Sequence, residues 1–177
     1  MSIASAPERI PELELHYRPL PGVAEAELMN ELLDGGTELS IEGPFGDVRV
    51  AAPLTEDLLL IAGGSGISQC RAILEHLRHA DHRRSVTLVW SVTQREHLYA
   101  DAELRSFAPW LNYEAVVDSP QATSAVLAWL RTRALPTSGR IVISGGPGFV
   151  HAVADTLNEL GATNVTIESD VFSYAPR

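Results

Sequence analysis

Residues 57–70, DLLLIAGGSGISQC, decide the fold of this chain. The unbroken apolar run at 58–62 is typical of a strand that is buried on both faces of a sheet. It ends in the glycine turn 63–66, and a helical pattern follows at once. Glycines let a backbone approach a ligand closely, and the first turn of a helix offers free N–H groups and a positive dipole end. The stretch therefore predicts a phosphate site in a nucleotide-binding domain.

The glycine turn matches none of the common fingerprints. GGSGIS lacks the third glycine of GxGxxG and the lysine of a P-loop. It is not a nucleophile elbow either, because Ile67 stands where GxSxG needs glycine. On the turn alone, a phosphate site and a plain tight β–α turn both remain open.

Composition limits the class of protein. The chain has 177 residues, 45% of them hydrophobic, a net charge of −10 and one cysteine, Cys70. A single cysteine excludes an intrachain disulfide framework and a cysteine-ligated iron–sulfur or zinc site. The negative charge argues against a nucleic-acid partner. Neither a transmembrane run nor a signal peptide is present, so we expect a cytoplasmic protein without a membrane partner.

Two parts are visible along the chain. Residues 1–53 are rich in proline and glycine, and residues 54–177 alternate strand and helix patterns. Such alternation predicts a doubly wound parallel sheet that is covered on both faces. In the first part we expect strands at 13–17, 38–42 and 48–50 and a helix at 25–33. In the second part we expect strands at 58–62, 86–90, 113–117, 141–143 and 165–167, and helices at 68–80, 100–108, 123–133 and 148–160.

Unusual residues follow three of the expected strands. Gly63 to Gly66 follow the first, Ser91 to Arg95 the second, and Gly145-Gly146-Pro147 the fourth. The carboxyl ends of parallel strands meet at one edge, where ligands of such sheets bind. Three special loops at one edge favour a binding site over a structural turn.

The order of five segments resembles the ferredoxin–NADP reductase superfamily, and within it the NAD(P)H–flavin reductases most closely. These segments are GPFG at 43–46, LLLIAGGSGIS at 58–68, LVWSVTQREHLYADAEL at 88–104, IVISGGPGFV at 141–150 and SDVFSY at 169–174. Residues 2–7, SIASAP, are similar to the segment that follows the family's Arg-x-aromatic pair, and Met1 stands at the aromatic position. The resemblance implies a chain that is truncated inside the flavin-binding barrel. Residues 1–53 would then be a partial antiparallel β-barrel before the five-stranded NAD(P)-binding domain at 54–177.

The resemblance also implies a flavin site for FAD or FMN, either bound or used as a substrate. Ser2 would contact the flavin near its reactive N5, and Asp170 would orient the nicotinamide amide or cap a turn; these two are the candidate catalytic residues. For Leu15, His16 and Tyr17 the alternative is an ordinary edge strand without a flavin contact. For Phe172 the alternative is an aromatic side chain that packs on the end of the sheet. The candidate flavin-binding residues are Ser2, Ile3, Ala4, Ser5, Leu15, His16, Tyr17 and Phe172.

A second set of residues is implied for NADH or NADPH. Arg95 would meet the adenosine end, and the absence of a second Lys or Arg in its loop slightly favours NADH. Gly145 replaces the family's cysteine, as in the flavin-reductase branch. We expect a larger side chain at Gly66 to block the diphosphate without unfolding the domain. The candidate nucleotide-binding residues are Gly63, Gly64, Ser65, Gly66, Ile67, Arg95, Gly145, Gly146 and Pro147.

The resemblance predicts an oxidoreductase that transfers hydride from NAD(P)H to a flavin, either as a flavin reductase or as the reductase component of an electron-transfer system. Its partner would be a small-molecule flavin or a redox protein. The alternative is a non-catalytic nucleotide-binding module. Because a half barrel leaves strand edges open, we expect a homo-oligomer that buries the region around Ile3, Leu13, Leu15 and Leu39. His76, His79 and His82 are expected to face solvent rather than to bind a metal.

Overall fold

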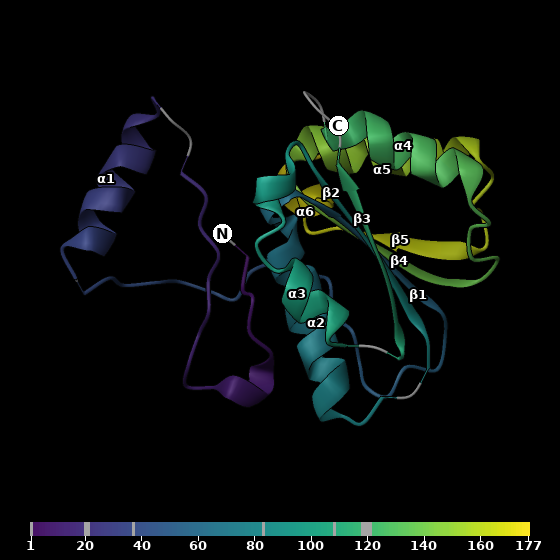
Figure 1. Ribbon diagram of the computed structural model, residues 1–177, viewed down its shortest axis with the longest axis horizontal. Coiled ribbons are helices and arrows are strands. Elements are labelled where there is room, and N and C mark those ends of the chain that lie inside the picture. The colour runs from purple at the N-terminus through teal and green to yellow at the C-terminus, as the bar shows by residue number, and fades with distance from the viewer. Residues whose placement is uncertain (1, 20–21, 37, 83, 108, 118–121) are drawn as a thin grey trace.

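All five predicted strands of residues 54–177 form one parallel sheet in the computed structural model (Figure 1). The structure describes residues 2–19, 22–36, 38–82, 84–107, 109–117 and 122–177. The strand order is β3-β2-β1-β4-β5, so β1 lies at the centre. The strands are β1 (Leu58–Gly63), β2 (Val86–Val92), β3 (Leu111–Val117), β4 (Gly139–Ser144) and β5 (Val165–Glu168).

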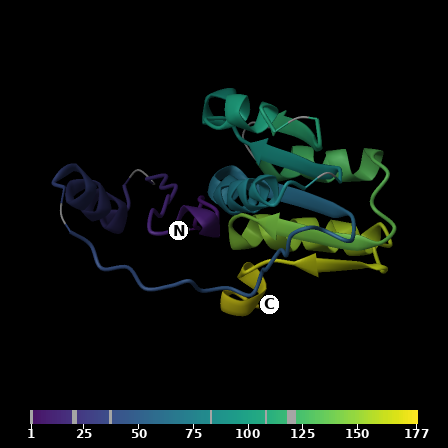
Figure 2. The ribbon, with the colours of Figure 1, turned by 90° about the horizontal axis from the view of Figure 1, so that it is seen from below.

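Helices cover both faces of the sheet, as Figures 1 and 2 show. On one face, α2 (Ile67–His79) lies over β1 and α3 (Asp101–Arg105) over β3, and both helices share a hydrophobic cluster with Leu58, Leu60 and Ala62. On the other face, α4 (Ala122–Thr132) lies over β2 and β3 and α5 (Pro147–Glu159) over β4, and they share a second cluster with the alternate residues, Leu59 and Ile61. The central strand is therefore buried on both faces, and the doubly wound α/β fold is confirmed.

Glycine residues follow two of the helices. In the first part of the chain, α1 (Ala24–Asp34) stops at Gly35, and Gly36 has φ +62°. After α5, Gly161 has φ +78°. Glycine adopts this left-handed conformation without the steric cost that a Cβ would add. A short helix, α6 (Val171–Tyr174), follows β5.

The expected barrel strands of residues 1–53 are not formed among the described residues. The β-pairing of the described residues within 1–53 consists of one antiparallel bridge, between Ile3 and Leu15. The segments 38–42 and 48–50 are extended chain without a strand partner. A strand is stabilised by the ladder it shares with a neighbour, and no described residue pairs with these segments. In Figures 1 and 2, α1 stands well apart from the sheet.

A buried ion network fastens the first residues of the chain to α2. Arg71 is 8% exposed, and its guanidinium donates to the carbonyl of Ala4 at 2.7 Å, to Glu14 at 3.0 Å and to Glu103 at 2.9 Å. One turn further along α2, the carboxylate of Glu75 accepts the Ala6 N–H at 2.8 Å. Residues 4–14 are thus held against the α/β part of the chain even though they form no sheet. Within the described ranges, no helix has the length and apolar character that crossing a membrane requires.

Candidate functional site

The two glycine loops meet at the carboxyl edge of the sheet. A Cβ built on Gly66 would lie 2.2 Å from the carbonyl oxygen of Ser144 and 2.7 Å from the nitrogen of Gly145. The start of α2 therefore touches the end of β4. Since the helices after β1 and β4 leave on opposite faces, this contact marks the switch point of the sheet, where doubly wound folds bind their ligands.

The loops leave room and hydrogen-bond donors for a ligand. Cβ atoms added at Gly64, Gly146 and Gly148 would meet nothing within 4 Å, and Gly64 has φ +55°. Neither α2 nor α5 has a side-chain cap at its N-terminus. In α2 the N–H of Ile67 already donates to the carbonyls of Gly64 and Ser65. The other N–H groups of the two helix starts, except that of Pro147, would donate to an anion's oxygens. These features fit the diphosphate of a dinucleotide.

Gly66 has a structural role that the sequence did not reveal. Its contact with Ser144 leaves no space for a side chain, so the expectation that valine at this position would leave the fold intact is wrong. Phe149 was also missed. Cβ atoms at Gly63 and Gly145 would lie 2.7 Å and 2.9 Å from its ring, so both glycines are needed to accommodate Phe149 on the first turn of α5.

Aromatic residues connect the loop after β2 to the glycine turn. Trp90 is fully buried, as expected of a core residue, and its Nε1–H donates to the carbonyl of Gly64 at 2.8 Å. Tyr99 packs edge-to-face on Trp90, with ring centroids 5.4 Å apart. Burial raises the pKa of Tyr99 to about 12, so its hydroxyl stays protonated near neutral pH. That hydroxyl lies 2.7 Å from Nδ1 of His16, so a continuous set of contacts runs from the candidate flavin segment to the phosphate turn.

A second cation lies beside the predicted adenosine loop. Arg95 is exposed in a short 3₁₀ helix directly after β2, as the sequence suggested. Arg18 comes from the other half of the chain, and its Nη2 donates to Nε2 of His97 at 3.3 Å. Because arginine can only donate, Nε2 accepts and Nδ1 carries the proton that it shares with Thr93, 3.0 Å away. The loop itself carries one arginine, as expected, and Arg18 adds a second cation from another part of the chain.

The candidate flavin residues of the first part differ in burial, since Ala4 and Ser5 are buried and the others are not. Ile3 and Leu15 pair directly, so the two segments that carry the candidates lie side by side. Ser2 is exposed, and Tyr17 donates its hydroxyl to the carbonyl of Ala26 in α1 at 3.1 Å. Ala4 and Ser5, in contrast, are only 0% and 3% exposed, and the Ser5 hydroxyl accepts the N–H of Glu14. A flavin role for the Ala4 and Ser5 side chains would require them to leave this packing.

Asp170 and Phe172 lie at the same edge of the sheet. The Asp170 carboxylate accepts hydrogen bonds from the backbone N–H groups of Asp47 and Val48 and from the side chain of Gln69. These are the contacts of a turn cap, the second of the two roles that the sequence left open. Phe172 is 36% exposed, and its ring centroid lies 5.9 Å from that of His151 on α5. Its role at a flavin remains a prediction.

In the part of the chain that the structure describes, the cysteine and the histidines of α2 do not gather into a metal site. Burial raises the pKa of the Cys70 thiol to about 12, which keeps it from acting as a thiolate. His76 bonds to Glu8 at 2.6 Å, and His79 is exposed. His82 is 3% exposed and packs on Trp110, so its expected exposure to solvent is wrong. It follows the last turn of α2, where the chain folds back toward the sheet.

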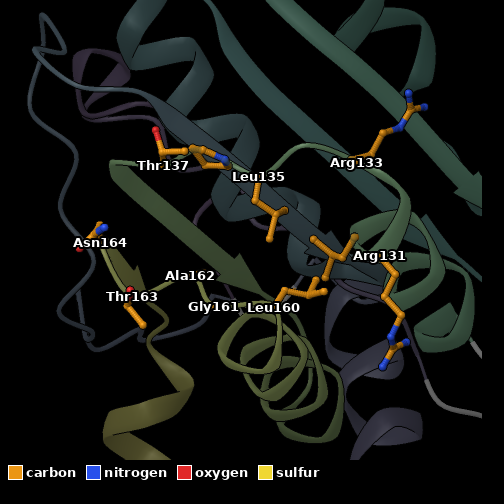
Figure 3. A pocket seen from close by; sticks show the side chains of 11 residues that line it. Arg131, Arg133, Leu135, Thr137, Leu160, Gly161, Ala162, Thr163 and Asn164 are labelled. Atoms are coloured by element: carbon orange, nitrogen blue, oxygen red, sulfur yellow. The ribbon is translucent and has the colours of Figure 1, made fainter.

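Two cavities of about 300 Å³ and about 310 Å³ lie at the opposite, amino edge of the sheet. The first lies between the ends of α4 and α5 and the starts of β4 and β5, and Arg131 and Arg133 point away from it (Figure 3). Neither cavity includes a residue of the glycine loops.

Comparison with known proteins supports the family resemblance. Residues 60–155, just over half of the chain, match the oxidoreductase NAD-binding domain family. A reductase component of terephthalate 1,2-dioxygenase from Comamonas is 27% identical over 99% of this chain and 55% of its own length. An NAD(P)H-flavin reductase from Aliivibrio fischeri is 37% identical over 60% of this chain and 48% of its own length. The chain spans about half the length of these relatives.

Solved structures share the fold. A cytochrome P450 reductase from Amycolatopsis superimposes with a TM-score of 0.69 at 24% identity, over 95% of this chain and 55% of the other. A ferredoxin–NADP⁺ reductase from Neisseria gonorrhoeae, solved with FAD and NADP, gives a TM-score of 0.66 at 19% identity, over 96% of this chain and 78% of the other. With its switch-point glycine loops and this family match, the chain belongs to the oxidoreductase NAD-binding domain family of the ferredoxin–NADP reductase superfamily.

Proposed function

We propose that this chain binds NADH or NADPH at its glycine loops and transfers hydride to a flavin, FAD or FMN. The observation that carries the proposal is the meeting of two uncapped helix N-termini, those of α2 and α5, beside Gly64 and Gly146. Backbone N–H groups and helix dipoles at these positions suit a diphosphate. They can hold this anion locally although the net charge of the chain is −10.

The nicotinamide end would lie toward the segments that carry Ser2, His16 and Phe172. Contacts from His16 through Tyr99 and Trp90 reach the carbonyl of Gly64, so the candidate flavin segment and the phosphate turn are held on the same side of the molecule. A flavin, when bound, supplies the chemistry of hydride acceptance. This chain's residues would contribute orientation and exclusion of water, and alignment of reactants can lower a barrier by ~7–11 kcal/mol.

Two of the relatives' names suggest the acceptor. The Aliivibrio protein is named an NAD(P)H-flavin reductase, and the Comamonas protein a reductase component of a dioxygenase. We therefore propose either a free flavin as substrate or a flavin that passes electrons to a redox partner protein, with the protein acting in the cytoplasm. Residues 1–53 would act as the flavin-side part and residues 54–177 as the nucleotide-binding domain.

The test is oxidation of NADH and NADPH by the purified chain with FMN, FAD and riboflavin in turn. We expect nicotinamide absorbance to fall faster than in protein-free controls. Nucleotide binding measured by calorimetry, without any such acceleration, would contradict the transfer.

A second candidate is a nucleotide-binding module without catalysis. It is favoured by the absence of barrel strands among the described residues of the first part, and by the burial of Ala4 and Ser5. In the same experiment it predicts tight nucleotide binding without flavin reduction.

A further inference from the structure

We propose that Asp170 is a positioning residue, which joins residues 46–48 to the first turn of α2, rather than a catalytic carboxylate. This inference rests on the proposed function, because the two parts that Asp170 joins are the proposed flavin side and the proposed nucleotide side of the protein.

Both oxygens of the Asp170 carboxylate are engaged. Oδ1 accepts the N–H of Asp47 at 2.9 Å and the N–H of Val48 at 3.0 Å. Oδ2 accepts Nε2–H of Gln69 at 2.7 Å. Hydrogen bonds to an ionised acceptor are shorter and stronger than neutral ones. One side chain therefore holds a segment that lies 122 positions away and a helix that lies 101 positions away.

Gly46 shows how closely the two segments approach. It has φ +105°, and a Cβ at this position would lie 2.4 Å from Oδ1 of Asp170. The backbone can reach the carboxylate only because residue 46 lacks a side chain. The GPFG segment that carried part of the family resemblance is thus shaped to receive Asp170.

We call the contacts of Asp170 with Asp47, Val48 and Gln69 the Asp170 joint. This joint reaches the proposed nucleotide site through Gln69. Gln69 lies in the first turn of α2, directly after the phosphate turn, where Ser68 Oγ also donates to the carbonyl of Ser65 at 2.6 Å. On the proposed flavin side of the joint, residues 46–48 directly follow Phe45, whose side chain is 77% exposed. A shift of one part against the other would change the distance between flavin and nicotinamide, and misplacement by about 1 Å can cost about a hundredfold in rate.

An experiment that exchanges the carboxylate of Asp170 and the amide of Gln69 distinguishes a positioning role from a catalytic one. Gln69→Glu sets two carboxylates against each other and should open the joint. Adding Asp170→Asn restores one donor and one acceptor, with the same net charge as the native pair. Asp170→Asn alone should be mild, because Gln69 can turn its amide to present its oxygen. Asp155→Asn is a matched control, since Asp155 pairs with Arg177 on the surface of α5.

We expect Gln69→Glu to lower kcat for flavin reduction about tenfold to a hundredfold, with amide exchange at Asp47 and Val48 accelerated. The double variant should regain most of the kcat and of the amide protection. Asp170→Asn should lose less kcat than Gln69→Glu, and Asp155→Asn should stay near the native kcat. A large loss of kcat in Asp170→Asn with native amide protection would instead make Asp170 catalytic.

Unchanged kcat in Gln69→Glu despite fast amide exchange would overturn the positioning role. If the native chain binds nucleotide but reduces no flavin, the proposed function fails, and the effect of Asp170 on hydride transfer fails with it. The amide data alone would then still report whether Asp170 holds residues 46–48.

Discussion

The hydroxyl of Tyr99 lies 2.7 Å from Nδ1 of His16, which joins the N-terminal segment to the loop after β2. The opposite nitrogen of His16 lies 3.0 Å from the carboxylate of Glu14. A carboxylate can only accept, so in neutral His16 Nε2 carries the proton and Nδ1 accepts from Tyr99. The imidazole is therefore fixed from both sides.

Replacing Tyr99 by phenylalanine removes this hydrogen bond and keeps the ring on Trp90. We expect a loss of about 0.5–1.5 kcal/mol in the free energy of unfolding, since Nδ1 then loses its donor. If the segment serves the flavin, kcat should also fall while KM for NADH stays the same. Thermal unfolding and steady-state kinetics measure the two effects, and a change in KM alone would place Tyr99 at the nucleotide instead.

The glycine loops permit a paired test at Gly146 and Gly66. Valine at Gly146 meets no protein atom within 4 Å of its Cβ, so it should leave the fold intact and obstruct only the ligand. We expect NADH affinity to fall at least tenfold, or ~1.4 kcal/mol. Valine at Gly66 collides with Ser144 and should destabilise the protein by about 1–3 kcal/mol or more. Native NADH affinity in the stable Gly146 variant would show that these loops are only structural.

If Arg18 and Arg95 both contact the adenosine end of the nucleotide, we expect the protein to prefer NADPH. The 2′-phosphate would meet both guanidinium groups, whereas NADH offers no charge there. Alanine at either position should weaken NADPH binding about tenfold, or ~1.4 kcal/mol, and NADH binding less. Arg131→Ala, at the amino edge of the sheet, serves as the control. Equal losses for both nucleotides in calorimetry would remove Arg18 and Arg95 from the phosphate-reading role.

Acid should release the N-terminal segment. The hydrogen bond from His16 holds the pKa of Glu14 below its ordinary value, and Arg71 and Arg9 act in the same direction. A carboxyl whose pKa is lower in the folded state stabilises that state above its unfolded pKa, and the gain is lost as pH falls through the folded pKa. We expect proteolysis within residues 4–14 to rise below about pH 4. Glu14→Gln should make that cleavage fast already at neutral pH, and a native-like cleavage profile in this variant would contradict the role of Glu14.

Apolar side chains on the first part favour self-association. Leu13, two residues before the bridge of Leu15 with Ile3, is 48% exposed, and Leu39 is 40% exposed. Exposed apolar patches and unpaired strand edges tend to find another chain. We expect a dimer or higher species in light scattering, which Leu13→Glu and Leu39→Glu should dissociate. Leu160→Glu, exposed at the far edge, should not. A native monomer would refute this.

The nucleotide-binding half was predictable because its signals are local. The run at 58–62 and the four other apolar segments each indicated a strand. The first part was not predictable in the same way. Its alternating segments indicate strands only if partner strands are present, and the described residues supply a single bridge.

The sequence predicted which loops form the candidate site. It did not predict the contacts that individual residues of the site make. The glycines of 63–66 were expected to serve a ligand, but Gly66 serves a contact with Ser144 that depends on the packing of β1 against β4. Arg18 and His97 lie 79 positions apart, and no local pattern links them. Asp170 illustrates the same limit, because its partners at 47, 48 and 69 come from separate parts of the chain.

Anaerobic flavin reduction by deuterium-labelled NADH tests the central claim most directly. If hydride passes from nicotinamide to flavin on this chain, flavin absorbance should bleach with a primary isotope effect and should be slowed by Gly146→Val. Nucleotide binding without protein-dependent bleaching would contradict the account and leave a nucleotide-binding module.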